Sequence, residues 1–255
     1  MKVASFDIFD TTLVRKSGKP ENIFYLLSKR AYPHDEALQN ALFLWRKGAE
    51  QKAMERQAKD NPTLEDIYAE FDWRSFPTCE SKTLMTWEVE LEMSDLVPVE
   101  STKQLIARKR SEGYTICFIS DMYLSGEVLK RKLQTEGCAT EADRVFVSCE
   151  WNADKRTGRL YEVVRTHLGN ISHWEHYGDN VRSDCKQACR KGIKAKRVYT
   201  DYTGAERQVM DSMRYSPLYF DLSILVGMQR AARLSQSVSS GSYAMADRDN
   251  AADFV

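Results

Sequence analysis

The fold is decided near the start of the chain, by the stretch Val3-Ala4-Ser5-Phe6-Asp7-Ile8-Phe9-Asp10-Thr11-Thr12. Residues 3–6 form a short apolar run, which stops at a series of acidic and hydroxyl residues. A short apolar run of this kind is typical of a strand buried inside a parallel sheet. We therefore expect a buried strand that delivers polar groups to its carboxyl end.

Three further apolar runs follow the same pattern. Residues 114–119 end at Ser120 and Asp121, residues 144–148 form a third run, and residues 174–177 lead into Gly178-Asp179. Amphipathic helices are predicted between and after these strands, at residues 99–112, 125–136, 160–167 and 183–191. Strands that alternate with helices predict an α/β fold with a doubly wound parallel sheet of the Rossmann type.

One long segment interrupts this alternation. Residues 20–96 contain helical patterns and no convincing strand, with the clearest helices at residues 22–31, 35–59, 63–71 and 79–95. We therefore expect an α/β core from residues 1–15 and 97–200, with an inserted helical cap at residues 16–96. Residues 201–255 are expected to form a C-terminal extension with a helix near residues 222–235. A Ser- and Gly-containing tail follows at residues 235–243, and either the end of the chain is mobile or the chain continues in a longer protein.

Composition limits the classes of partner. The 37 lysines and arginines balance the 37 aspartates and glutamates, so no net field favours nucleic acid or an anionic membrane. The six cysteines form no Cys-x-x-Cys pair, and no signal-peptide pattern opens the chain, which indicates reduced thiols in the cytoplasm. No apolar run approaches the roughly 20 residues that span a bilayer.

The polar residues that follow the strands are expected to converge. In an open parallel sheet, ligands bind outside the carboxyl ends of the strands. An aspartate after an apolar run is by itself more often a turn or capping residue. Acidic, hydroxyl or basic groups at four successive strand ends, however, together indicate a site.

The order of these groups carries a family resemblance. Over about residues 1–200 the chain resembles haloacid dehalogenase-like hydrolases, whose four motifs are matched by Asp7-Ile8-Phe9-Asp10-Thr11, Ser120, Lys155 and Gly178-Asp179-Asn180-Val181-Arg182-Ser183-Asp184. It is especially similar to a subgroup of predicted hydrolases that open with Phe-Asp-Ile-Phe-Asp-Thr and carry Ser-Asp-Met-Tyr-Leu as the second motif. That subgroup is found beside, or fused to, bacterial surface-polysaccharide glycosyltransferases. The resemblance therefore implies a sugar phosphate as substrate and a glycosyltransferase as partner.

The resemblance also implies a catalytic set. Asp7 would be the nucleophile and would form an aspartyl-phosphate, while Ser120 and Lys155 would hold the phosphoryl oxygens. A phosphomonoester dianion repels a carboxylate, so this attack needs positive charge beside the phosphoryl group. Lys155 and Mg²⁺ would supply it. Asp10 is the expected source of acid-base help.

The remaining motif positions are expected to bind metal or substrate. Mg²⁺ prefers a few carboxylates together with water and substrate phosphate. We expect its ligands to be Asp7, the backbone carbonyl of Phe9, and Asp179 with Asp184, although Asp184 could instead cap the helix that begins near Ser183. The substrate contacts implied by the motifs are Thr11, Asp121 and Asn180.

Phe9 departs from the family pattern. Phosphatases of this superfamily usually carry a second aspartate two residues after the nucleophile, which protonates the leaving oxygen and then activates water. A phenyl ring cannot move a proton. Shifting the motif so that Asp10 becomes the nucleophile would place Val14 where a threonine is expected, so we retain Asp7.

Three functions remain open. The chain is a phosphatase in which Asp10 or a cap residue replaces the missing acid, or a hydrolase acting at carbon, as dehalogenases with an aromatic residue at this position do. The third function is a non-catalytic binding module. The acidic motif at residues 179–184 makes sense chiefly as a metal site, which a dehalogenase does not need, and the intact motif set argues against loss of activity. We therefore favour a Mg²⁺-dependent phosphatase.

The cap is expected to close over the site and to determine substrate specificity. The candidate substrate contacts in the cap are Tyr25, Trp45, Arg46 and Tyr68. Their spacing also suits ordinary helix packing, and we favour packing for each of them. The four histidines show no metal-ligand spacing and receive no role, namely His34, His167, His173 and His176.

Overall fold

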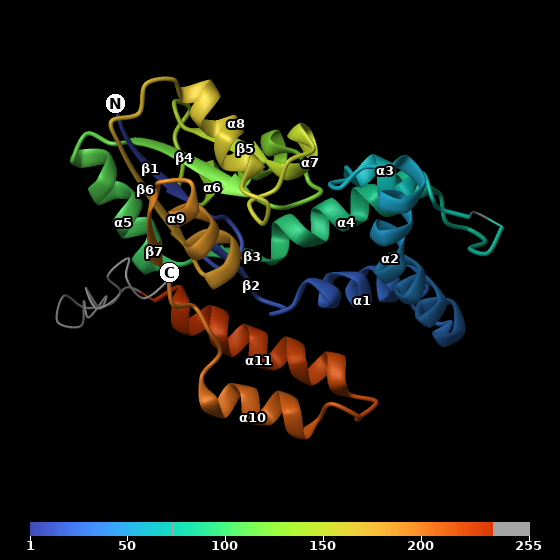
Figure 1. Ribbon diagram of the computed structural model, residues 1–255. Coiled ribbons are helices and arrows are strands. Elements are labelled where there is room, and N and C mark those ends of the chain that lie inside the picture. Colours follow the sequence, from blue (N-terminus) through green and yellow to red (C-terminus); the bar gives the residue numbers. More distant parts are fainter. Residues whose placement is uncertain (73, 237–255) are drawn as a thin grey trace. The chain divides into compact units, whose positions relative to one another are not determined.

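The computed structural model describes residues 1–72 and 74–236 (Figure 1). The chain divides into two compact units. We call the first the core unit, which consists of Met1–Val14, Val97–Asp201 and the described part of Ala232–Val255. The second, the helical unit, consists of Arg15–Leu96 and Tyr202–Ala231.

The core unit is built on a five-stranded sheet in the order β5-β4-β1-β6-β7. All neighbouring strands are parallel. The strands are β1 (Lys2–Phe6), β4 (Thr115–Ser120), β5 (Arg144–Val147), β6 (His173–Gly178) and β7 (Lys194–Arg197). Phe6 at the end of β1 lies opposite Phe118 of β4 and Tyr177 of β6, so the three central strands finish at the same edge.

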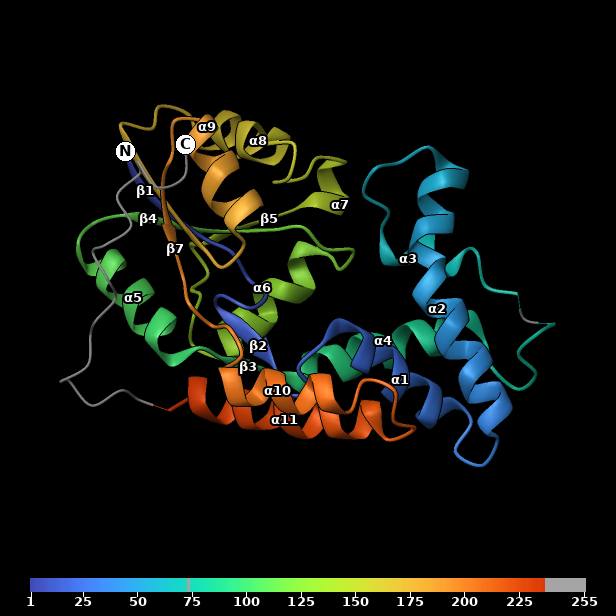
Figure 2. The same cartoon turned by 60° about the horizontal axis from the view of Figure 1, so that its bottom comes forward.

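Helices cover both faces of this sheet. Figure 2 shows α8 (Arg159–Leu168) and α9 (Ala188–Arg190) on one side, and α5 (Glu100–Ser111) and α6 (Gly126–Thr135) on the other. On the first side, Val3, Ile119 and Trp174 from the strands form one buried cluster with Leu160 and Val164 of α8. The predicted α/β fold with a doubly wound parallel sheet and an inserted helical domain is confirmed.

Some elements differ from the prediction. The expected helix at residues 183–191 is a π-helix, η1 (Val181–Gln187), followed by the short α9. A single turn, α7 (Ser148–Trp151), follows β5. The short strands β2 (Leu13–Arg15) and β3 (Leu96–Pro98) form a second, two-stranded sheet that was not expected.

The helical unit contains the predicted insertion helices. These are α1 (Pro20–Ala31), α2 (Glu36–Gln57), α3 (Leu64–Tyr68) and α4 (Ser81–Asp95). Asp35 caps α2 by accepting from the Leu38 N–H, and Thr63 begins α3 with a capping box. Helix α1 packs against α2 and α4, and α2 against α3.

The C-terminal segment was expected to form a separate extension, but most of it belongs to the helical unit. It forms α10 (Gly204–Ser212) and α11 (Tyr219–Leu234). Asn22 Nδ2 of α1 donates to Ser223 Oγ of α11 at 2.9 Å. A Cβ added at Gly227 would lie 2.5 Å from the backbone nitrogen of Gly18, so α11 approaches that loop backbone to backbone.

The interior of the helical unit contains charged pairs. Arg46 is almost fully buried and donates from Nε and Nη2 to both carboxylate oxygens of Glu88, at 2.6 and 2.7 Å. The Tyr68 hydroxyl donates to the same carboxylate. Arg46 and Tyr68 are therefore packing residues, as expected.

The sequence predicted no membrane span, and it predicted a tail near the end of the chain. None of the helices within the described residues is both long and apolar enough to cross a membrane. The predicted tail at residues 235–243 lies, after its first two residues, outside the described part of the chain, as do residues 251–255.

Candidate active site

Asp7 lies directly after β1, at the edge where the central strands end. Its backbone N–H donates to the Tyr177 carbonyl at 2.8 Å, and the Thr12 hydroxyl donates to its carbonyl at 2.6 Å. The residue is 6% exposed. The end of the buried strand and the turn that follows it therefore fix the position of this carboxylate.

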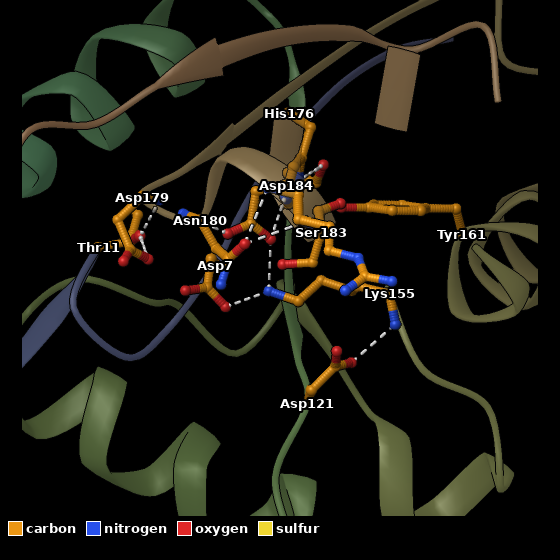
Figure 3. Close-up of polar contacts among 12 residues, drawn as sticks. Asp7, Thr11, Asp121, Lys155, Tyr161, His176, Asp179, Asn180, Ser183 and Asp184 are labelled. Atoms are coloured by element: carbon orange, nitrogen blue, oxygen red, sulfur yellow. Dashed lines mark hydrogen bonds and ion pairs between the residues drawn. The ribbon is translucent and has the colours of Figure 1, made fainter. Parts of the chain in front are cut away.

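Lys155 pairs with Asp7. The Lys155 ammonium lies 2.5 Å from Asp7 Oδ1 and 2.7 Å from Asp184 Oδ1 (Figure 3). The Lys155 backbone N–H donates to Asp121 Oδ1 at 2.8 Å, so Asp121 helps to hold the lysine in place. Burial lowers the pKa of Lys155, but the carboxylates of Asp184 and Asp7 outweigh this effect and raise the pKa well above its usual value, which keeps the ammonium charged.

Asp184 is positioned by the π-helix that follows β6. The Asn180 side chain caps this helix by accepting from the N–H groups of Arg182 and Ser183. The Cys185 N–H reaches back five residues to the Asn180 carbonyl at 3.3 Å, as a π-helix requires. The Asn180 N–H donates to Asp184 Oδ2 at 3.0 Å, which turns the carboxylate toward the strand ends.

Asp179 completes a group of three carboxylates. The Thr11 hydroxyl lies 3.2 Å from Asp179 Oδ1 and accepts from the Asp179 backbone N–H at 3.0 Å. One oxygen each from Asp7, Asp179 and Asp184 lie within 4.8 Å of one another. We call these three residues the acidic cluster.

The electrostatics of the acidic cluster fit a divalent cation. Burial raises the pKa of Asp7 well above its usual value, and Asp184 and Asp179 raise it further against the opposing effect of Lys155. Burial, with the nearby charges of Asp10 and Asp184, raises the pKa of Asp179 to about 6. One lysine thus leaves negative charge uncompensated, and carboxylate oxygens at this spacing are the ligands that Mg²⁺ prefers.

The other predicted site residues lie nearby. Ser120 is the last residue of β4 and is almost fully buried. Phe9 forms an isolated parallel bridge with Leu13. Asp10 has a left-handed backbone, with φ at 58°, and its carbonyl accepts from the Thr200 hydroxyl. The charge of the Asp10 carboxylate raises the pKa of Asp179, so the Asp10 side chain lies near Asp179.

Three residues predicted to contact substrate have partners within the protein. Thr11 is fully buried against Asp179, and Asn180 caps the π-helix. Asp121 is exposed and holds the backbone of Lys155. Substrate contact by these residues stays a prediction.

The sequence reasoning assigned no role to His176, yet it contacts the site. Its Nε2 lies 3.4 Å from Asp184 Oδ1, and its Nδ1 lies 2.8 Å from Ser5 Oγ. A histidine inside a buried strand is more often a core residue, and no spacing motif connects His176 to Asp184. Only the sheet register, which places Ser5 opposite His176, brings these groups together.

Comparison with known proteins gives a structural match only. No protein-family model matches the chain, and no curated protein sequence is similar to it. Among solved structures, the L-2-haloacid dehalogenase of Xanthobacter autotrophicus is similar with a TM-score of 0.56 at 14% identity, covering 94% of this chain and 90% of that one. That enzyme was solved with chloropropionic acid covalently bound.

Two further structures are similar over less of the chain. The hydrolase YfnB of Bacillus subtilis, solved with magnesium, has a TM-score of 0.53 at 14% identity and covers 79% of this chain and 90% of its own. A phosphatase of Thermococcus onnurineus has a TM-score of 0.50 at 18% identity, with 80% and 88% covered. Together these matches show that the chain has the fold of the haloacid dehalogenase-like hydrolases.

Proposed function

We propose that this protein is a Mg²⁺-dependent phosphohydrolase that acts on a small phosphomonoester. One observation carries the proposal. Asp7 directly follows the central strand with the Lys155 ammonium 2.5 Å from its carboxylate, and two further carboxylates lie within 4.8 Å of it. A nucleophile, a buried cation and a set of metal ligands therefore converge on one strand end.

In the proposed reaction, an Asp7 carboxylate oxygen attacks the phosphorus atom. A bond forms between Asp7 and phosphorus, the bond to the leaving oxygen breaks, and water then hydrolyses the aspartyl-phosphate. Lys155 favours the ionised form of Asp7, against the effect of burial, and would neutralise charge on the phosphoryl oxygens. Mg²⁺, held by the acidic cluster and the Phe9 carbonyl, would add positive charge beside the phosphoryl group.

The leaving oxygen requires a proton that Phe9 cannot supply. Asp10 is the proposed substitute, because its charge acts on Asp179 and its backbone is held in a left-handed turn. General acid help contributes about 10²- to 10⁴-fold to rate. A substrate with a poor leaving group would therefore react slowly if Asp10 is poorly placed.

The finer assignment rests on the sequence resemblance. We propose a sugar phosphate of surface-polysaccharide synthesis as substrate and a glycosyltransferase as partner, because residues 6–11 and 120–124 match the motifs of that subgroup. We also propose a cytoplasmic location. None of the six cysteines forms a disulfide, as is usual in a reducing compartment.

A second function deserves a direct test because of Phe9. Hydrolysis at carbon, as in dehalogenases, needs an aspartate nucleophile but no metal, and an aromatic residue at this position suits it. The acidic cluster supports the phosphatase instead. Chloride release from 2-chloropropionate, compared with phosphate release from phosphomonoesters, separates the two functions.

The decisive experiment is hydrolysis of p-nitrophenyl phosphate with and without MgCl₂. We expect Mg²⁺-dependent release that disappears in Asp7→Asn and persists in Asp211→Asn, which changes an exposed aspartate on α10. If folded protein that binds Mg²⁺ releases nothing above the Asp7→Asn background, the phosphatase proposal is wrong. A non-catalytic module would then be favoured.

A further inference from the structure

A chain of buried polar groups leads from the interior of the sheet to Asp184. The Trp174 indole N–H donates to Ser5 Oγ at 2.8 Å, and Ser5 Oγ lies 2.8 Å from His176 Nδ1. His176 Nε2 lies 3.4 Å from Asp184 Oδ1. His176 and Ser5 are fully buried, so no water competes for these contacts.

The direction of hydrogen bonding in this chain follows from the groups themselves. An indole can only donate, so Ser5 Oγ accepts from Trp174. The Asp184 carboxylate already accepts from the Lys155 ammonium and has no proton to give, so His176 Nε2 must carry the hydrogen. The Ser5 hydroxyl has two acceptors in reach, the Glu175 carbonyl at 3.3 Å and the unprotonated Nδ1 at 2.8 Å, and the shorter contact directs its hydrogen to Nδ1.

Packing holds the imidazole in this orientation. The Tyr161 ring lies 5.2 Å from the His176 ring at an interplanar angle of 78°. The Tyr161 hydroxyl donates to the Ser183 carbonyl at 3.0 Å, which connects the same aromatic ring to the π-helix that carries Asp184 (Figure 3). The ring that orients His176 is therefore tied to the backbone beside its partner.

We propose that His176 is a positioning residue that fixes the Asp184 carboxylate for metal binding, with Ser5 and Trp174 selecting the imidazole tautomer. The inference rests on the proposed function, because it takes Asp184 as a ligand of Mg²⁺. Groups that hold a metal ligand in place commonly change metal affinity by about 10- to 100-fold when they are removed.

The test measures Mg²⁺ binding by isothermal titration calorimetry, without any substrate. We expect His176→Phe, which keeps a ring but cannot donate, to weaken Mg²⁺ binding by about 10- to 100-fold. His176→Gln can place an amide N–H near the position of Nε2 and should recover most of this loss. Ser5→Ala and Trp174→Phe should weaken binding less, because each leaves the imidazole in place.

Tyr177→Phe is the matched control. Tyr177 follows His176 on β6 and is equally buried, but its hydroxyl donates to Glu175 and makes no contact with Asp184. Its removal tests whether any lost hydrogen bond on this strand weakens the metal site. We expect Mg²⁺ affinity in Tyr177→Phe to match the wild type.

Each alternative result is informative. Wild-type affinity in a folded His176→Phe, or equal weakening in Tyr177→Phe, would overturn the role of His176 while leaving the metal site intact. If His176→Phe fails to fold, the comparison of His176→Gln and Ser5→Ala with Tyr177→Phe decides the same question. If the wild type itself binds no Mg²⁺, the proposed metal site fails and the inference fails with it.

Discussion

Gly178 has no side chain where the Asp184 carboxylate lies. A Cβ added at Gly178 would stand 2.4 Å from Asp184 Cγ and 2.6 Å from Asp184 Oδ2, distances that real atoms do not tolerate. The backbone of Gly178 at this position is not in the left-handed region, so the requirement is for space and not for backbone freedom. The glycine of the Gly-Asp motif therefore makes room for the second aspartate of the same motif.

Gly178→Ala should displace Asp184. We expect it to destabilise the protein by about 1–3 kcal/mol, as overpacking of a buried site usually does, and to weaken Mg²⁺ binding. Thermal unfolding and calorimetric titration with MgCl₂ measure the two effects. Gly48→Ala is the control, because a Cβ there meets nothing within 4 Å and the residue lies within α2. A Gly178→Ala protein that binds Mg²⁺ normally would contradict this account.

Lys155→Met should leave buried carboxylates without their cation. Because Asp7 and Asp184 both pair with this ammonium, we expect the metal-free protein to lose about 3–5 kcal/mol of stability near neutral pH. Lys191→Met removes a pair with Glu162 that is largely exposed and should cost at most about 1 kcal/mol. Urea unfolding of both variants makes the comparison, and equal losses would argue against a special role for Lys155.

Phe9→Asp should supply the missing general acid. For alkyl phosphates, whose leaving oxygen needs a proton, we expect kcat to rise by up to about 10²- to 10⁴-fold. For p-nitrophenyl phosphate the gain should be smaller, because that leaving group departs without protonation. Phe9→Leu should give no gain with either substrate. The same gain with both substrates would show that the new carboxylate acts in some other way.

The pKa of Asp179 predicts how metal stabilisation depends on pH. In the folded protein this pKa is about 6, which is above the usual 3.8. The protonated Asp179 carboxyl therefore stabilises the metal-free fold below about pH 4, and this stabilisation is lost as pH rises through about 6. Mg²⁺ competes with the proton for this carboxylate. We therefore expect the rise in Tm caused by MgCl₂ to increase from about pH 4 to about pH 7. In Asp179→Asn the rise in Tm caused by MgCl₂ should depend less on pH. A rise in Tm that stays constant across that pH range in the wild type would contradict the prediction.

The sequence predicted the elements that have an internal apolar pattern. Strands β1, β4, β5 and β6 each contain a buried run, and the polar residues after them do meet. Strand β7 was missed because Lys194–Arg197 reads Lys-Ala-Lys-Arg, and this edge strand has no apolar run to detect. The capping box of Thr203 and Glu206 did mark the start of α10, but without an apolar stripe it was overlooked.

Contacts between distant residues could not be predicted in the same way. The hydrogen bond from Asn22 to Ser223 joins residues 201 positions apart, and neither residue belongs to a motif. The contact between His176 and Asp184 depends on a π-helix. Its hydrogen bonds run from the N–H of residue i to the carbonyl of residue i−5, and this pattern has no established sequence signal. The family resemblance of the strand-end motifs therefore indicated the residues of the acidic cluster, while the groups that hold them in place could be found only in the structure.

The position of β1 in the sheet determines when the acidic cluster can assemble during translation. Lys2–Phe6 precedes both of its neighbours in the sheet along the chain, because β4 begins at Thr115 and β6 at His173. Asp7 is therefore synthesised before Lys155, Asp179 and Asp184, the three residues that surround its carboxylate. A nascent chain that stops before β6 would carry Asp7 without Asp179 and Asp184, so the acidic cluster can assemble only after β6 and the π-helix that follows it have been made.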